Sequence, residues 1–379
     1  MTLIQFEGEE SINFKKSRDK DRTFNPLPVR IKVLGVGGAG CSIVSRIFSQ
    51  NWKNISFMVC DSSVKTLASC GGMDRFLLGE SVTKGWGTGG DREIAKKIAQ
   101  EAEKDIRGLL DDVDLLFLVC SLSKGLGAGA SPVFLKVARE KGLLTIGFFI
   151  LPFGFEGKES VINSQEVLND LWQLVDGAVV ISNDTLLHPE KADFDNSSVS
   201  LTEVFSRVDE VFGVLLRSIE NILYNPGLIN IDFADLKSFL TKGRQVMITT
   251  AEGKGEESVD EVIEELFYSP FWGEIPFKRA KGVLLTIRSG KDFKLYQLER
   301  IILSLREKTG LFIPITFGVY LEKNLSDNIT LTLMTSTRRE LNLRPEKDQD
   351  YSRKDSVSGD YNQQDLDVPT FLRKQFNPT

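Results

Sequence analysis

The sequence of 379 residues contains a single histidine, His188, and only four cysteines. One histidine argues against Ser-His-Asp triads and multi-histidine zinc sites. The cysteines show no metal-type spacing, so we interpret them as reduced thiols; they are Cys41, Cys60, Cys70 and Cys120. Any catalysis must therefore use carboxylates, lysines, backbone dipoles or a bound ion.

Long apolar runs and an excess of basic residues are also lacking. No stretch approaches the roughly 20 apolar residues that span a bilayer, and the first residues, "MTLIQFEGEESINFKK", do not resemble a signal peptide. The net charge of -6 argues against general nucleic-acid binding. We therefore expect a soluble, cytoplasmic protein with no nucleic-acid partner and no direct membrane insertion.

Short apolar runs alternate with amphipathic segments from Val29 onward. Helical periodicity occurs over 92–110 and 132–142, with Pro132 suited to a first helical turn. The buried strands expected around them are 29–36, 55–60, 114–120, 143–151 and 177–182. This alternation predicts an α/β fold with a parallel sheet that is covered on both faces.

A long helix is expected over 200–225, where Ser200 and Glu203 have capping-box spacing. A second series of shorter runs follows and predicts a mixed sheet with helices over 257–268 and 294–308. The predicted organisation is a flexible arm (1–28), a nucleotide-binding domain (29–199), a central helix (200–226), a C-terminal domain (227–338), a disordered linker (339–364) and a partner-binding peptide (365–379).

Three glycine clusters lie at junctions between expected strands and helices: "GVGGAG" (35–40), "GWGTGG" (85–90) and "GLGAG" (125–129). Small residues let backbone N–H groups approach phosphate oxygens at a helix N-terminus. The first cluster, with Asp61 about 20 residues further on, fits a dinucleotide-binding pattern. Three such clusters are more than the single pyrophosphate of a dinucleotide needs, so they suit a triphosphate that several loops surround. A P-loop is absent, because Lys124 precedes its glycines.

Several strings occur in the order of the FtsZ branch of the tubulin superfamily, and the chain resembles that family over about residues 30–338. They are "IKVLGVGGAG", "GWGTGG", "GLGAGASPV", "LPFGFEGK", "NDTLL" and "PGLINIDFADLK"; the resemblance resumes at "DLDVPTFLRKQ" near the end of the chain. It implies a GTP-binding domain with a parallel sheet, a long central helix and a second α+β domain with a mixed sheet. It also implies a GTPase that polymerises head to tail at the bacterial division site.

The resemblance implies that GTP binds to the glycine clusters of one subunit. The loop "NIDFAD" (230–235) of the next subunit would then complete the hydrolytic site through Asn230, Asp232 and Asp235. Such carboxylates can orient water or a hydrated cation for phosphoryl transfer. The local alternative is that Asp232 caps a helix and Asp235 stabilises its N-terminal dipole.

The resemblance also implies a set of nucleotide-binding residues. Glu156 would bind the ribose, Phe205 would stack on guanine, and Asn183 and Asp209 would bind the polar edge of the base. The remaining candidates would surround the phosphates: Gly37, Gly38, Gly40, Asp61, Gly87, Gly89, Lys124, Gly125, Gly127, Ala128 and Gly129. No metal-ligand cluster is predicted; the expected cofactor is GTP or GDP, with Mg²⁺ or K⁺ as the expected ion.

The third glycine cluster departs from the family pattern. Leu126 and Ala128 stand where threonines are usual, and Lys124 replaces a glycine. Lost donors to phosphate predict slower turnover, so the alternative is a filament scaffold that binds GTP with weak or no hydrolysis. A minor alternative, from the first cluster alone, is an NAD-dependent oxidoreductase.

The expected partners are further copies of the chain and a membrane-tethering division protein such as FtsA. The second would bind residues 365–376, where apolar anchors stand among charges. The expected location is the mid-cell ring on the inner face of the membrane.

Overall fold

The structure is a computed structural model that describes residues 28–187, 200–254, 259–269, 273–274, 279–310, 312–322, 325 and 328–338. The predicted arm, linker and partner-binding peptide lie outside these residues, apart from Pro28. In the described part, no helix is long and apolar enough to cross a membrane.

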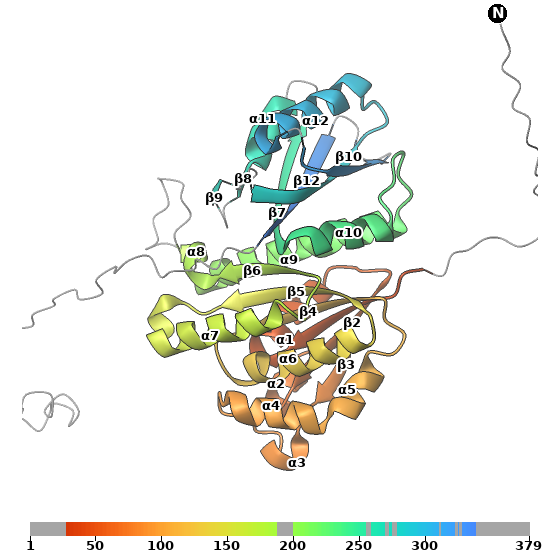
Figure 1. Cartoon of the computed structure of the whole chain (residues 1–379). Coiled ribbons are helices and arrows are strands. Elements are labelled where there is room, and N and C mark those ends of the chain that lie inside the picture. Colours follow the sequence, from red (N-terminus) through yellow and green to blue (C-terminus); the bar gives the residue numbers. More distant parts are fainter. Residues whose placement is uncertain are drawn as a thin grey trace, which may run out of the picture. The chain divides into compact units, whose positions relative to one another are not determined.

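One ten-stranded sheet runs through the described residues, in the order β11-β10-β12-β7-β6-β5-β4-β1-β2-β3 (Figure 1). Its first strands in the chain are β1 (Ile31–Val36), β2 (Ile55–Asp61), β3 (Asp74–Leu77), β4 (Leu115–Ser121), β5 (Leu144–Leu151) and β6 (Gly177–Ser182). The others are β7 (Arg244–Lys254), β10 (Ala280–Ser289), β11 (Ile315–Leu321) and β12 (Asn328–Arg338), while β8 (Tyr268–Ser269) and β9 (Gly273–Glu274) form a separate pair. Strands β1 to β6 pair in parallel, and β12 runs antiparallel to both β7 and β10. The expected parallel and mixed regions are thus parts of one sheet, joined where β6 pairs with β7.

Helices cover both faces of this sheet. They are α1 (Gly37–Phe48), α2 (Val64–Ala68), α3 (Glu80–Thr83), α4 (Arg92–Glu101), α5 (Glu103–Leu109), α6 (Gly125–Glu140), α7 (Lys158–Leu171), α8 (Asn183–Leu187), α9 (Leu201–Tyr224), α10 (Phe233–Gly243), α11 (Val259–Leu266) and α12 (Leu295–Thr309), with a 3₁₀ turn η1 (Gly154–Glu156). Alternate strand residues enter different cores: Val33 packs with α1, α9 and α10, whereas Leu34 packs with α4 to α7. A third core joins β7, β10, β11 and β12 to α11 and α12.

Two predicted helices differ from the observed ones. The helix expected over 92–110 is broken at Ala102 into α4 and α5. The helix expected from residue 132 starts at Gly125, so Pro132 lies inside α6 rather than in its first turn. The glycine cluster itself forms the first turn of α6, because its small residues fit between β4 and the neighbouring elements.

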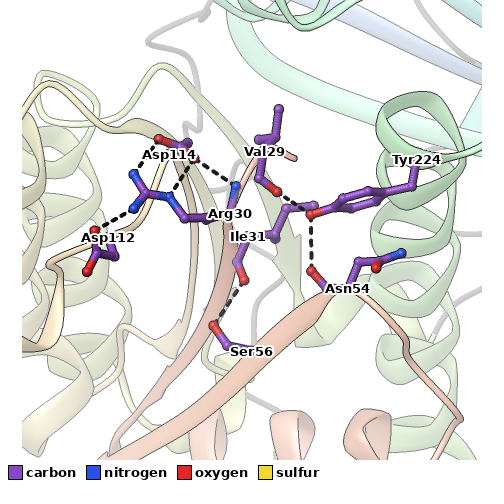
Figure 2. Close-up of polar contacts among 8 residues, drawn as sticks. All are labelled: Val29, Arg30, Ile31, Asn54, Ser56, Asp112, Asp114 and Tyr224. Atoms are coloured by element: carbon purple, nitrogen blue, oxygen red, sulfur yellow. Dashed lines mark hydrogen bonds and ion pairs between the residues drawn. The ribbon is translucent and has the colours of Figure 1, made fainter. Parts of the chain in front are cut away.

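The N-terminal ends of the strands are tied together by polar contacts around Arg30 (Figure 2). Its guanidinium lies 3.0 Å from both carboxylate oxygens of Asp114 and 2.5 Å from Asp112, and its backbone N–H donates to Asp114 over 2.8 Å. This bidentate pair joins the start of β1 to the start of β4, which are neighbours in the sheet.

The C-terminal end of α9 is fixed to the same edge of the sheet. The hydroxyl of Tyr224 lies within hydrogen-bonding distance of the backbone oxygens of Val29 and Asn54, which precede β1 and β2 (Figure 2). Helix α9 therefore ends beside the N-terminal edge of the parallel strands.

We expect Asp114→Asn to lower the midpoint of thermal unfolding at pH 7, because it removes the ion pair with Arg30. The decrease should be only roughly 1–3 °C, since water screens this half-exposed pair. The Arg30 guanidinium holds the pKa of the Asp114 carboxyl below its ordinary value. The stabilisation is therefore complete above the unfolded-state pKa of about 3.9 and is lost as the pH falls below it. Thermal unfolding from pH 3 to pH 7 should show the two proteins converging at acid pH.

The control is Asp292→Asn, which removes an exposed carboxylate without an ion pair in the described region. A constant difference between Asp114→Asn and the unsubstituted chain at every pH would contradict the assigned role of the charge.

Candidate functional site

The three glycine segments meet at the C-terminal ends of β1 and β4. A Cβ atom added to Gly37 would lie 2.8 Å from the backbone nitrogen of Gly127, so the first and third segments touch. The backbone N–H of Gly125 donates to the oxygen of Gly90 over 2.9 Å, which joins the third segment to the second. The contact requires glycine at Gly37 and Gly125, which have φ angles of 76° and 63°.

Helices α1 and α6 both begin at this meeting point, and in neither does the side chain of the N-cap residue form a capping hydrogen bond. Their N-cap residues are Val36 and Lys124, and neither first turn carries an acidic residue. By contrast, α4 is capped by Asp91, which accepts from the backbone of Glu93 over 2.8 Å. Uncapped N–H groups and two positive helix ends converge here, which is the arrangement that binds phosphate.

The glycines in these segments have two different roles. A Cβ atom on Gly40, Gly127 or Gly129 would come within 2.3 Å of a backbone oxygen, so these three are needed for close packing of α1 and α6. A Cβ atom on Gly38 or Gly89 would meet no other described element within 4 Å, which leaves space for a ligand. The positions predicted as one phosphate-binding set therefore divide into packing glycines and open glycines.

The two positions that lack threonine hydroxyls face the core. Leu126 and Ala128 are 5% and 2% exposed and pack with residues of α4 and β4. Ala128 can therefore serve a ligand only through its backbone.

Asp61 ends β2 beside the second glycine segment. Its carboxylate accepts from the N–H of Ser63 over 2.8 Å, and Ser62 accepts from the N–H of Gly87 over 3.1 Å. Burial raises the pKa of Asp61, while backbone hydrogen bonds oppose this shift. These contacts hold the second glycine segment against the C-terminal end of β2, where Asp61 lies.

A second group of predicted residues follows β5 and β6. Glu156 is exposed and accepts from the N–H of Phe153 over 3.0 Å. Asp184 accepts from the N–H of Gly154 over 2.9 Å, which ties η1 to α8. Asn183, the first residue of α8, is 7% exposed, and its Oδ1 has no hydrogen-bond partner among the described residues. A buried amide oxygen without a partner is costly, and a bound ligand would satisfy it.

Asp209 lies one turn after Phe205 on α9 and pairs with Arg46 of α1. The distances are 2.5 Å from Nε to Oδ2 and 2.9 Å from Nη2 to Oδ1. Burial raises the pKa of Asp209, although Arg46 opposes the shift. Sequence reasoning missed Arg46, which is 163 residues away and carries no local signal.

Sequence reasoning also missed Thr88, a half-buried hydroxyl in the second glycine segment. Its Oγ1 lies 3.5 Å from where a Cβ atom of Gly125 would be. The only available signal was its position between Gly87 and Gly89.

The loop with Asn230, Asp232 and Asp235 lies at the other end of α9. This helix has 24 residues and is about 36 Å long, and it ends at the N-terminal edge of the strands. Asn230 accepts from the N–H of Gly227 over 2.7 Å, and the adjacent Ile229 forms a β-bridge with Val319. One chain therefore does not bring these residues to the glycine segments.

Asp232 and Asp235 form a reciprocal capping box at the start of α10. Oδ1 of Asp232 accepts from the N–H of Asp235 over 2.7 Å, and Oδ2 of Asp235 accepts from the N–H of Asp232 over 3.2 Å. The local alternative from the sequence is thus correct for the single chain. One oxygen of each carboxylate has no hydrogen bond within the described region, so the cap leaves acceptors available.

No group of three or more His, Cys, Asp or Glu side chains in the described residues could hold a metal ion. The fold and the site together define a class: an α/β protein in which three glycine segments meet at the C-terminal edge of the parallel strands. Helix α9 separates these segments from the 230–235 loop and its carboxylates.

Comparison with known proteins identifies the family. The model of the Tubulin/FtsZ family, GTPase domain, matches residues 30–189, and that of the FtsZ family, C-terminal domain, matches 244–337. The cell division protein FtsZ of Aquifex aeolicus is 30% identical over 309 residues, covering 82% of this chain and 83% of its own. That of Coxiella burnetii is 28% identical over 358 residues, with 93% and 90% covered.

Solved structures agree. An empty FtsZ dimer from M. jannaschii has a TM-score of 0.70 at 27% identity, covering 81% of this chain and 88% of that one. CetZ2 from Haloferax volcanii, a GTPγS-bound protofilament, has a TM-score of 0.68 at 19% identity and shares the fold, covering 83% and 95%. The chain belongs to the FtsZ family. The predicted family and fold are confirmed, and the oxidoreductase alternative is wrong.

We expect Gly37→Ala to destabilise the folded chain by about 1–3 kcal/mol, because alanine is strained at a positive φ and its Cβ would meet the backbone of Gly127. Gly38→Ala is the matched control, since this neighbouring position has open space and an ordinary φ. Urea unfolding of the two variants measures the difference. Equal stabilities would show that the first and third glycine segments do not touch.

Proposed function

We propose that the GTPase site of this FtsZ-family protein is divided between two copies of the chain. The protein is a GTP-binding, GTP-hydrolysing cytoskeletal protein of cell division. The observation that carries the proposal is the separation of the glycine segments from the 230–235 loop by the length of α9. A surface with the nucleotide then meets the opposite surface of the next copy. Such a head-to-tail contact repeats without closing and produces protofilaments.

In the nucleotide half, the glycine segments bind the phosphates with backbone N–H groups of α1 and α6. Gly38 and Gly89 line the ligand, and Gly37, Gly40, Gly87, Gly125, Gly127, Ala128 and Gly129 shape the backbone that holds it. Asp61 lies beside the second glycine segment at the edge of this half, and Glu156 binds the ribose. The proposal is supported by the convergence of these segments from three parts of the chain.

The base lies between Asn183 and α9. Phe205 is 37% exposed and stacks on guanine, while the unpartnered Oδ1 of Asn183 gains a hydrogen bond. Asp209 accepts from guanine N1–H and N2–H₂ with the lone pairs that Arg46 leaves free. Arg46 keeps this carboxylate ionised and fixes its direction.

Hydrolysis requires a water molecule in line with the γ-phosphate. The free carboxylate oxygens of Asp232 and Asp235 from the next copy accept protons from this water molecule and orient it, while Asn230 holds the 230–235 loop in place. The water oxygen then attacks the γ-phosphorus as the bond to GDP breaks. Mg²⁺ or K⁺ would neutralise phosphate charge; phosphate oxygens and one or two carboxylates suffice to hold Mg²⁺. Loss of the γ-phosphate then weakens the contact between copies.

The tail at residues 365–376 is proposed to bind a membrane-tethering division protein such as FtsA, which would hold the filament at the inner face of the membrane. Its support is the sequence alone: the anchors Leu366, Val368 and Phe371 among charged residues.

We expect Asp235→Asn to bind GTP normally and to release phosphate at least tenfold more slowly at every protein concentration, because its amide cannot accept a proton as a carboxylate does. The unsubstituted chain should show activity that rises above a threshold concentration. Phosphate release and sedimentation with GTP against GDP, measured together, test both points.

Glu299→Gln is the control, because it neutralises an exposed carboxylate of α12 outside the proposed site. Activity proportional to protein concentration without a threshold would contradict the divided site. Sedimentation with GTP without phosphate release would favour the scaffold alternative.

We expect Asp209→Asn to weaken GTP binding about tenfold or more and to improve xanthosine triphosphate binding, because an amide donates to the xanthine oxygen that replaces N2–H₂. Glu210→Gln, on the next residue of α9, should change neither affinity. Calorimetric titration of both nucleotides measures this, and an unchanged preference for GTP would exclude Asp209 from base recognition.

A further inference from the structure

Lys124 occupies the N-cap position of α6, where the three glycine segments meet. Its side chain is exposed, and its aliphatic stem lies against the second segment: a Cβ atom on Gly90 would be 3.5 Å from Cδ of Lys124. Within the residues that the structure describes, no carboxylate forms an ion pair with it. The stem is thus held against the second segment, and the ammonium has no counter-charge among the described residues.

A cation at this place opposes the stability of the free protein. The positive ends of α1 and α6 already converge here, since Gly37 and Gly127 are in backbone contact. Positive charge at a helix N-terminus is unfavourable, whereas an anion there is favourable. Lys124 is therefore poorly placed for the fold alone and well placed for a polyphosphate.

Thr88 supplies a hydroxyl at the same place from the second segment. Its Oγ1 lies 3.5 Å from the position of a Cβ atom on Gly125, the residue that follows Lys124. The hydrogen bond from Gly125 to Gly90, 2.9 Å long, fixes the two segments relative to each other. Over the described residues, the Thr88 hydroxyl has no hydrogen bond of its own.

We propose that Lys124 and Thr88 form the polyphosphate clamp of this chain. The side chains of Leu126 and Ala128 face the core and donate nothing, so an ammonium and a hydroxyl from two segments provide the side-chain donors instead. Charge-assisted hydrogen bonds to phosphate are the strong ones, and the lysine acts as a mobile point charge. The inference rests on the proposed guanine-nucleotide site and specifies how its phosphates are held.

The test uses the full chain, freed of nucleotide, and titrates GTP, GDP and GMP by calorimetry, with Mg²⁺ and with EDTA. Lys124→Met keeps the stem against Gly90 and removes only the charge, and Thr88→Val removes only the hydroxyl. Lys104→Met is the matched control, because it removes an exposed lysine from the first turn of α5.

We expect Lys124→Met to weaken GTP binding about tenfold or more in EDTA, with smaller losses for GDP and GMP, since fewer phosphate charges remain to be bound. Thr88→Val should weaken GTP binding severalfold. In nucleotide-free protein, Lys124→Met should leave the unfolding midpoint unchanged or raise it, which a structural role would not do.

Unchanged GTP affinity in Lys124→Met, with normal binding by the unsubstituted chain, would overturn the clamp and leave the proposed function standing. A lower unfolding midpoint in the nucleotide-free variant would also overturn it. Failure of the unsubstituted chain to bind GTP even with Mg²⁺ would overturn the proposed function and the clamp together.

Discussion

The length of α9 is the constraint on which the rest of the structure depends. A straight helix of 24 residues keeps its two ends about 36 Å apart, whatever the sequence at either end. Asp209 near its start contacts α1, and Tyr224 at its end contacts the segments that precede β1 and β2. Because α9 is fixed to α1 near its start and to the segments before β1 and β2 at its end, it cannot bring the 230–235 loop to the glycine segments within one chain. With the site divided as we propose, hydrolysis therefore requires assembly.

The nucleotide half depends on how closely backbones can approach one another. Gly40 and Gly127 let α1 and α6 pack against oxygen atoms of β4, at distances that any Cβ atom would forbid. The two helix N-termini come together for this reason, and the N-cap side chain of neither helix caps it. The same close packing buries Leu126 and Ala128 in the core, so in the proposed site only the backbone of these residues is available to the phosphates.

Much of this could be predicted from the sequence, because it depends on local pattern. The strand–helix alternation predicted the parallel sheet, and the strings in order predicted the family. The glycine clusters predicted the phosphate site that we propose at one edge of this sheet. Local pattern failed where packing decides. Pro132 suggested a helix start, but the glycines before it are themselves helical. The Arg46–Asp209 pair joins residues 163 positions apart, which no spacing rule connects.

The two halves of the site also differ in how far each satisfies its own polar groups. The 230–235 loop is complete by itself, since Asp232 and Asp235 cap each other's backbone. The nucleotide half contains uncapped helices, a buried amide oxygen of Asn183 without a partner and an unpaired Lys124 within the described residues. A ligand with phosphates and a polar base edge removes all of these penalties at once. In the divided site that we propose, the unsatisfied half therefore binds the nucleotide first, and the self-satisfied half adds its spare carboxylate oxygens only when another copy carries it there.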